Sequence, residues 1–235
     1  MTQHGVERLA RFDGNERLLH WANAVLFGVL MVTAAALYLD PLAALIGRRA
    51  TVRQIHVIAG LALPVPILAA LVGPWRAALR RDWAELARWD AGDRRWLRSG
   101  GRAYGDGPPG PSDHARHVLR FRAHGKFHPG QKLNAAATLG FIGVLLGTGA
   151  IMRWFGPFPL AWRTGATFVH DWTAIVAVVV VAGHIRMALA DRPAMSSMIR
   201  GWVPADWARQ HRPKWFETET GRPAAEANPP HDSSS

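Results

Sequence analysis

The 235-residue chain contains no cysteine. Cysteine thiolates hold iron–sulfur clusters, attach c-type haem and form disulfides, so this chain can do none of these. Acidic residues are also scarce, with 17 Asp and Glu against 28 Lys and Arg, for a formal net charge of +11. Any redox chemistry in this chain therefore has to use its 11 histidines.

Charged residues are missing from four long stretches of a chain that is 49% hydrophobic. No Asp, Glu, Lys or Arg occurs in residues 18–39, 54–75 or 133–152, and Asp171 alone interrupts residues 164–185. Each stretch is close to the roughly 20 residues that an α-helix needs to cross a bilayer. We therefore predict an all-α integral membrane protein, a four-helix bundle with spans at about 18–39, 54–75, 133–152 and 164–188 within a domain of residues 1–217.

A cleaved signal peptide is the alternative explanation of the first apolar stretch. Its apolar run is longer than the 7–15 residues typical of a signal peptide, which favours a membrane span. Of the 28 Lys and Arg residues, 23 lie before the first of these charge-poor stretches, between the second and third, or after the fourth. The positive-inside rule then predicts that both termini and a loop of residues 76–132 are cytoplasmic.

The predicted cytoplasmic loop begins with an amphipathic pattern. Leu79, Trp83 and Leu86 follow helical spacing with charged residues between them, which predicts a helix on the inner membrane surface. The basic residues cluster next to the span ends, so anionic lipid explains them better than nucleic acid does. A Gly- and Pro-rich linker follows at 101–113, and residues 218–235 are predicted to be a disordered tail.

Four histidines lie within or at the edge of the predicted spans, namely His20, His56, His170 and His184. Polar side chains inside a membrane are costly and usually functional. His170 and His184 are separated by 14 residues on one helix, which is about 21 Å and nearly four turns. The fourth span therefore presents one imidazole near each side of the bilayer, on nearly the same face.

Alternating span directions bring the four histidines to two depths. His20 pairs with His184 at the cytoplasmic side, and His56 pairs with His170 at the outer side. Two imidazoles on opposite faces of one porphyrin bind haem b, so the pairs predict two haem b groups that form an electron path. Zinc or copper is the alternative metal, although the distance between the pairs disfavours a single cluster.

Several ordered motifs resemble the cytochrome b (gamma) subunit of membrane-bound formate dehydrogenase, a member of the di-haem four-helix cytochromes b. The resemblance covers about residues 11–215. It rests on "NERLLHWANAVLF", "RQIHVIAGLALPVP", "GKFHPGQKLNA", "GTGAIMRWFGPFPLAWRTGATFVHDW" and "AGHIRMALADRPAMSSMIRGWVP". It implies that the four histidines are haem ligands in the pairing given above.

The resemblance also implies a role and partners. The chain would sit in the bacterial cytoplasmic (inner) membrane, take electrons from an iron–sulfur subunit and reduce a quinone. Formate would be oxidised on a molybdenum- or tungsten-containing subunit. Two alternatives stay open: the cytochrome b subunit of a hydrogenase or another molybdoenzyme, and a haem-free membrane scaffold or transporter.

The resemblance further implies a quinone site in the loop before the third span. In the family this loop reads like "GKFNAGQK", and its Asn and Gly line the quinone pocket. Here His128 replaces that Asn, while Gly130 and Gln131 match the family pattern. Met187 and Ala188, one helical turn beyond His184, are further candidates for this pocket.

Overall fold

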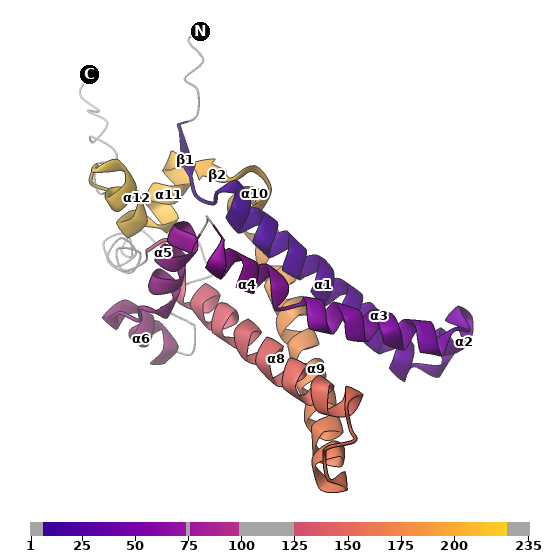
Figure 1. Cartoon of the computed structure of the whole chain (residues 1–235). Coiled ribbons are helices and arrows are strands. Elements are labelled where there is room, and N and C mark those ends of the chain that lie inside the picture. The colour runs from indigo at the N-terminus through magenta and orange to yellow at the C-terminus, as the bar shows by residue number, and fades with distance from the viewer. Residues whose placement is uncertain (1–6, 74–75, 99–124, 225–235) are drawn as a thin grey trace, which may run out of the picture. The chain divides into compact units, whose positions relative to one another are not determined.

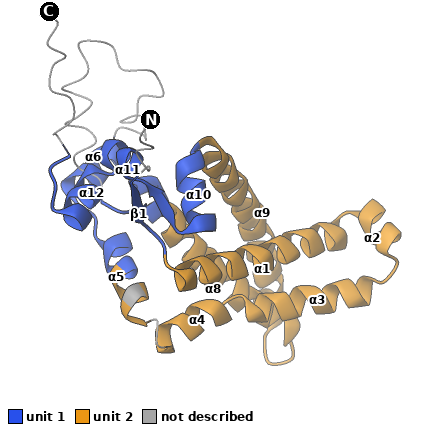
Figure 2. Ribbon diagram, turned by 90° about the horizontal axis from the view of Figure 1, so that it is seen from above, with its two compact units in different colours: residues 1–12, 82–133, 191–235 blue, residues 13–81, 134–190 orange. Residues whose placement is uncertain are grey.

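A computed structural model describes residues 7–73, 76–98 and 125–224. The chain divides into two compact units, of residues 1–12, 82–133 and 191–235 (unit 1) and of residues 13–81 and 134–190 (unit 2) (Figure 2). Helices dominate both units, which confirms the all-α prediction. The structure adds one short two-stranded sheet that the sequence analysis did not predict.

Unit 2 contains the apolar helices. Among the described residues, four segments are long and apolar enough to cross a membrane, as predicted. They are α1 (Gly14–Tyr38), α3 (Arg49–Ala62) continued by α4 (Val65–Val72), α8 (Pro129–Arg153) and α9 (Leu160–Ala190). The short helix α2 (Asp40–Ile46) connects α1 to α3, which packs against α1 (Figure 1).

Helix α1 begins four residues before the charge-free stretch that predicted it. Asp13 caps the helix, because its side chain accepts hydrogen bonds from the backbone N–H groups of Asn15 and Glu16, both at 2.8 Å. The side chain of Glu16 accepts in return from the backbone N–H of Asp13, which completes a capping box. The charge-free stretch therefore predicts the apolar part of the helix, whereas the cap determines the residue at which the helix starts.

The second span is broken in the middle, at Leu63 and Pro64. Proline has no backbone N–H and its ring clashes with the preceding turn, so α3 ends at Ala62. Pro66 lies in the first turn of α4, where proline is tolerated because that N–H has no helical acceptor. The two prolines thus coincide with a break between two helices (Figure 1).

Large apolar side chains point outward from the helices of unit 2. Val32 of α1, Ile58 of α3 and Val179 of α9 are each about two-thirds exposed, at 68%, 67% and 66%. An exposed apolar surface of this extent is unfavourable in water and favourable in lipid. The outward faces of these helices are therefore suited to a bilayer.

Unit 1 has a small core of its own. Strand β1 (Arg8–Ala10) pairs antiparallel with β2 (Trp202–Pro204), so that Leu9 lies opposite the fully buried Val203. The helices α10 (Arg192–Arg200), α11 (Ala205–His211) and α12 (Pro213–Thr220) belong to the same unit. Trp207, Ala208, Trp215 and Phe216 complete the core beside Val203.

The predicted amphipathic segment forms two helices, α5 (Arg76–Ala87) and α6 (Ala91–Arg98). Of its predicted apolar positions, Leu79 is buried, whereas Trp83 is 37% exposed.

The predicted linker at 101–113 lies outside the described residues. The tail predicted from residue 218 differs at its start, because α12 continues to Thr220 and the Ala224 N–H donates to Glu217. Residues 225–235 of that tail lie outside the described residues.

Candidate functional site

One pair of imidazoles faces each other between α3 and α9. The rings of His56 and His170 have centroids 6.3 Å apart and planes inclined by 67°. His56 lies about two turns before the break at Pro64, and His170 lies in the first half of α9. The structure therefore brings together the two histidines that the sequence analysis paired.

The second pair lies between α1 and α9. The ring centroids of His20 and His184 are 6.2 Å apart, with planes inclined by 55°. His20 also makes an edge contact with Trp21 at 5.3 Å. Because His170 and His184 both belong to α9, that helix supplies one imidazole to each pair.

The spacing within each pair fits one metal ion between two imidazoles. A metal–imidazole bond is about 2 Å long and the ring centroid lies about 1 Å beyond the nitrogen, so two opposed ligands place their centroids about 6 Å apart. The observed separations of 6.2 and 6.3 Å match this value. Both histidine pairs are thus spaced for bis-histidine ligation of a haem iron.

Threonine hydroxyls orient the rings of one pair. Thr33 Oγ1 lies 2.8 Å from His56 Nδ1, and Thr148 Oγ1 lies 2.9 Å from His170 Nδ1. Each hydroxyl donates its single proton to a carbonyl four residues earlier, at Val29 or Val144, both at 2.7 Å. Each threonine oxygen can then only accept from its histidine, so the ring proton is on Nδ1 and Nε2 can bind iron.

The sequence analysis missed both threonines. The sequence does contain a pattern that could have indicated them. Each threonine precedes its histidine by almost the same interval, 23 residues for Thr33 and 22 for Thr148. That interval links neighbouring antiparallel helices, and only the packed structure shows that these side chains meet.

The histidine pairs can also be compared with the ligand sets that other metal ions require. Among residues 7–73, 76–98 and 125–224, no group of three or more His, Cys, Asp or Glu side chains could hold a metal ion. A structural zinc ion uses four protein ligands and a catalytic one uses three. The paired imidazoles therefore fit haem better than zinc.

The loop before α8 belongs to unit 1 and positions His128. The backbone N–H of Gly130 donates to His128 Nδ1 at 2.9 Å, and the side-chain oxygen of Gln131 accepts from the His128 backbone N–H at 2.9 Å. Trp96 of α6 meets the imidazole edge to face at 5.2 Å. Because Nδ1 accepts a hydrogen bond, the ring proton of neutral His128 is on Nε2.

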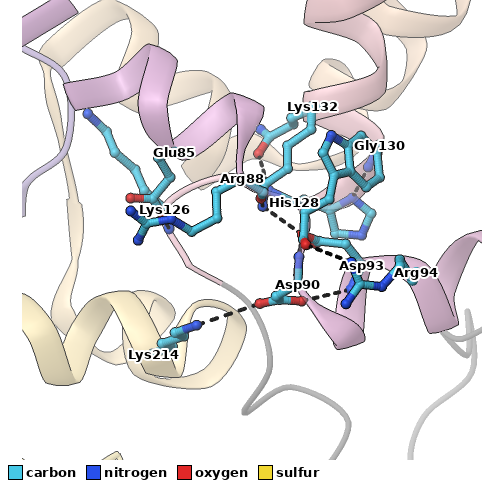
Figure 3. Close-up of polar contacts among 12 residues, drawn as sticks. Glu85, Arg88, Asp90, Asp93, Arg94, Lys126, His128, Gly130, Lys132 and Lys214 are labelled. Carbon is cyan, nitrogen blue, oxygen red and sulfur yellow. Dashed lines mark hydrogen bonds and ion pairs between the residues drawn. The ribbon is translucent and has the colours of Figure 1, made fainter. Parts of the chain in front are cut away.

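A buried ion pair supports this loop, and sequence reasoning did not find it. Lys132 Nζ lies 2.7 Å from Asp93 Oδ2 and donates to the Arg88 carbonyl at 2.8 Å (Figure 3). The side chains of Lys132 and Asp93 are only 7% and 2% exposed. Asp90 and Asp93 also exchange hydrogen bonds between side chain and backbone at the start of α6. The pair therefore joins α6 to the first turn of α8.

The pKa of a buried arginine in unit 1 is shifted from its usual value. Burial and the charge of Arg212 lower the pKa of Arg11 to about 9, against the opposing effect of Asp191 and Asp82. Arg11 still carries its charge near neutral pH and donates to the Lys126 carbonyl at 3.2 Å. Unit 1 therefore contains a buried cation.

Asp90 has a lowered pKa. Burial alone would raise it, but the hydrogen bond from the Asp93 backbone and the charges of Lys214 and Lys132 outweigh burial.

Met187 and Ala188, the remaining candidates for the quinone pocket, belong to α9 in unit 2, and Met187 is 62% exposed. Their role stays a prediction.

Apolar helices that hold facing histidine pairs define the class of this protein as a membrane cytochrome of the b type. A family model described as prokaryotic cytochrome b561 matches residues 11–201. The chain belongs to the prokaryotic cytochrome b561 family, and membership implies that it carries haem b.

Curated relatives have similar sequences. The chain is 33% identical over 95 residues to the formate dehydrogenase cytochrome b556(fdo) subunit of Escherichia coli, covering 39% of this chain and 45% of the relative. It is 26% identical over 225 residues to the formate dehydrogenase cytochrome b556 subunit of Haemophilus influenzae, covering 90% and 84%. The chain thus spans less than half the length of the Escherichia coli relative and most of the Haemophilus influenzae one.

Proposed function

We propose that this chain is the membrane cytochrome b subunit of a formate dehydrogenase complex, with two haem b groups. It would take electrons from an iron–sulfur subunit and deliver them to a quinone, while a molybdenum- or tungsten-containing subunit oxidises formate. The observation that carries the proposal is the spacing of 6.2 and 6.3 Å in the two imidazole pairs. The names of the curated relatives support formate as the substrate of the complex.

The chain's own residues hold and orient the cofactor. Haem b supplies reversible one-electron chemistry when bound. Nε2 of His56 and Nε2 of His170 would bind one iron, while Thr33 and Thr148 hold the two rings in the required tautomer. His20 and His184 would bind the second iron. The apolar spans around both pairs exclude water.

Placement in the bacterial inner membrane, with both termini cytoplasmic, is part of the same proposal. It is supported by the 23 of 28 Lys and Arg residues on the side that includes the termini. His20 and His184 would then lie near the cytoplasm, and His56 and His170 near the outer surface. Electrons would enter at the outer pair and leave at the inner pair.

The quinone site is proposed at His128, Gly130 and Gln131. The hydrogen bond from Gly130 to His128 Nδ1 places the ring proton on Nε2, which can donate to a quinone carbonyl. Trp96 and the Lys132–Asp93 ion pair fix the loop that carries this ring. Imidazole can also pass a proton to a reduced quinone.

The purified membrane complex tests the proposal directly. We expect a b-type absorption band on reduction, two haem groups per chain, and co-purification with an iron–sulfur subunit and a formate-oxidising subunit. A chain without haem would support a scaffold or transporter instead. Haem together with a hydrogenase or another molybdoenzyme as partner would overturn the assignment to formate dehydrogenase.

Replacing His128 with Phe should impair quinone reduction while both haems stay bound and reducible. Phe keeps a planar ring for Trp96 but removes the donor. Loss of one neutral hydrogen bond costs about 0.5–1.5 kcal/mol, which is roughly a threefold to tenfold rise in quinone KM. A further loss in kcat is expected if His128 also transfers protons. Steady-state quinone reduction by the complex measures both constants.

The matched control is His128→Asn, because Asn also offers a donor and an acceptor and should keep most activity. Unchanged quinone affinity and rate in His128→Phe would show that the quinone binds elsewhere.

A further inference from the structure

The two histidine pairs differ in what their rings contact. His56 and His170 each donate from Nδ1 to a threonine hydroxyl, at 2.8 and 2.9 Å. Within the described part of the chain, by contrast, no hydrogen bond reaches the ring of His20 or His184. The pairs thus match in spacing and differ in their hydrogen bonds.

A hydrogen bond from Nδ1–H changes how strongly the imidazole Nε2 donates electrons to a bound iron. When the Nδ1–H of a bound imidazole donates to an acceptor, the ring becomes a more basic ligand at Nε2. A more basic ligand stabilises the oxidised iron more than the reduced iron, which lowers the reduction potential. Both His56 and His170 are made more basic in this way, so their two effects on the reduction potential add.

We infer that Thr33 and Thr148 lower the reduction potential of the haem at the His56–His170 pair below that of the haem at the His20–His184 pair. This inference rests on the proposed function, which supplies two haems. It makes electron transfer from the first pair to the second favourable. Each transfer oxidises iron(II) to iron(III) at one pair and reduces iron(III) to iron(II) at the other, and the rings keep their Nδ1 protons.

A purely structural role for the threonines is the competing explanation. Threonine in an apolar helix often donates to the carbonyl four residues earlier without any further function. Thr138 of α8 does this, since its hydroxyl donates to the Asn134 carbonyl at 2.8 Å and bonds to none of the histidines that the structure describes. Thr138 therefore provides a matched control in the same helix as Thr148.

The experiment compares Thr33→Val, Thr148→Val and their double variant with Thr138→Val. Valine keeps the shape of threonine and removes the hydroxyl. The full-length protein is purified with its haems, and a spectroscopic redox titration resolves the two transitions. Haem content is measured on every sample, and Thr33→Ser and Thr148→Ser test rescue by a retained hydroxyl.

We expect each single valine variant to raise the ratio of reduced to oxidised haem about threefold to tenfold at a fixed ambient potential, for the lower-potential haem only. A tenfold change corresponds to a shift of 59 mV for one electron. The double variant should shift further. The serine variants and Thr138→Val should titrate like the unmodified protein, and the other transition should not move in any variant.

Three results would overturn the inference. The first is an unchanged potential in the double variant with both haems bound. The second is an equal shift in Thr138→Val. The third is loss of the haem from the valine variants while the serine variants keep it at the original potential, because the hydroxyl would then serve binding only. An unmodified protein that binds fewer than two haems would instead refute the proposed function.

Discussion

Replacing His56 or His170 with Ala is expected to remove one and the same haem, and replacing His20 or His184 is expected to remove the other. The reason is the geometry within each pair, where centroids 6.2 or 6.3 Å apart leave space for one iron between two rings. With one ring deleted, the iron loses an axial ligand and the apolar helices provide no substitute. Haem per chain should fall from two to one in each single variant.

The assay is haem quantification together with a redox titration that resolves the two transitions. His56→Ala and His170→Ala should lack the same transition and keep the other, and His20→Ala and His184→Ala should show the reverse. His211 of α11 is a suitable control, since its ring stacks on Trp207 in unit 1, and His211→Ala should keep both haems. If His20→Ala and His56→Ala lost the same transition, the pairing would be incorrect.

Breaking the buried ion pair should have the largest effect on stability. Lys132→Met leaves Asp93 as an uncompensated charge that is only 2% exposed in its side chain. Removing one partner of a buried pair typically costs about 3–5 kcal/mol. We expect a decrease of this size in the free energy of unfolding of unit 1, measured by denaturant titration in detergent with tryptophan fluorescence.

A surface ion pair of the same unit provides the control. Lys214 Nζ lies 3.6 Å from Asp90 Oδ2, and the Lys214 side chain is 58% exposed. Exposed pairs contribute about 0–1 kcal/mol, so Lys214→Met should change stability little. The double variant Asp93→Asn/Lys132→Met should be less destabilised than the sum of its single changes, because it leaves no unpaired charge. Equal effects of Lys132→Met and Lys214→Met would contradict the prediction.

The arrangement of the histidines could be predicted from the sequence because it follows from simple periodicity. A separation of 14 residues puts His170 and His184 on one helical face, and alternating spans then leave His56 and His20 as the matching partners. Helix ends were harder to predict. Missing charges show where a helix is apolar, but the start of α1 depends on the capping box between Asp13 and Glu16.

Contacts between distant segments could not be predicted in this way. Lys132 and Asp93 are 39 residues apart, with the stretch 99–124 between them, and no local pattern links the two side chains. The threonines that meet His56 and His170 depend on how neighbouring helices are aligned along their axes, which composition does not determine. The small sheet was missed because β1 and β2 have three residues each, too few for an alternating pattern.

Helix α9 carries one imidazole for each pair, and this makes the length of the segment between His170 and His184 a constraint in its own right. Inserting one residue between them would rotate one histidine by about 100° relative to the other, so both could no longer face their partners. Inserting seven residues would nearly restore the shared face but move the two sites apart by about 10 Å. The valine-rich spacer can therefore exchange one apolar side chain for another, whereas its residue count is fixed by the two sites that it separates.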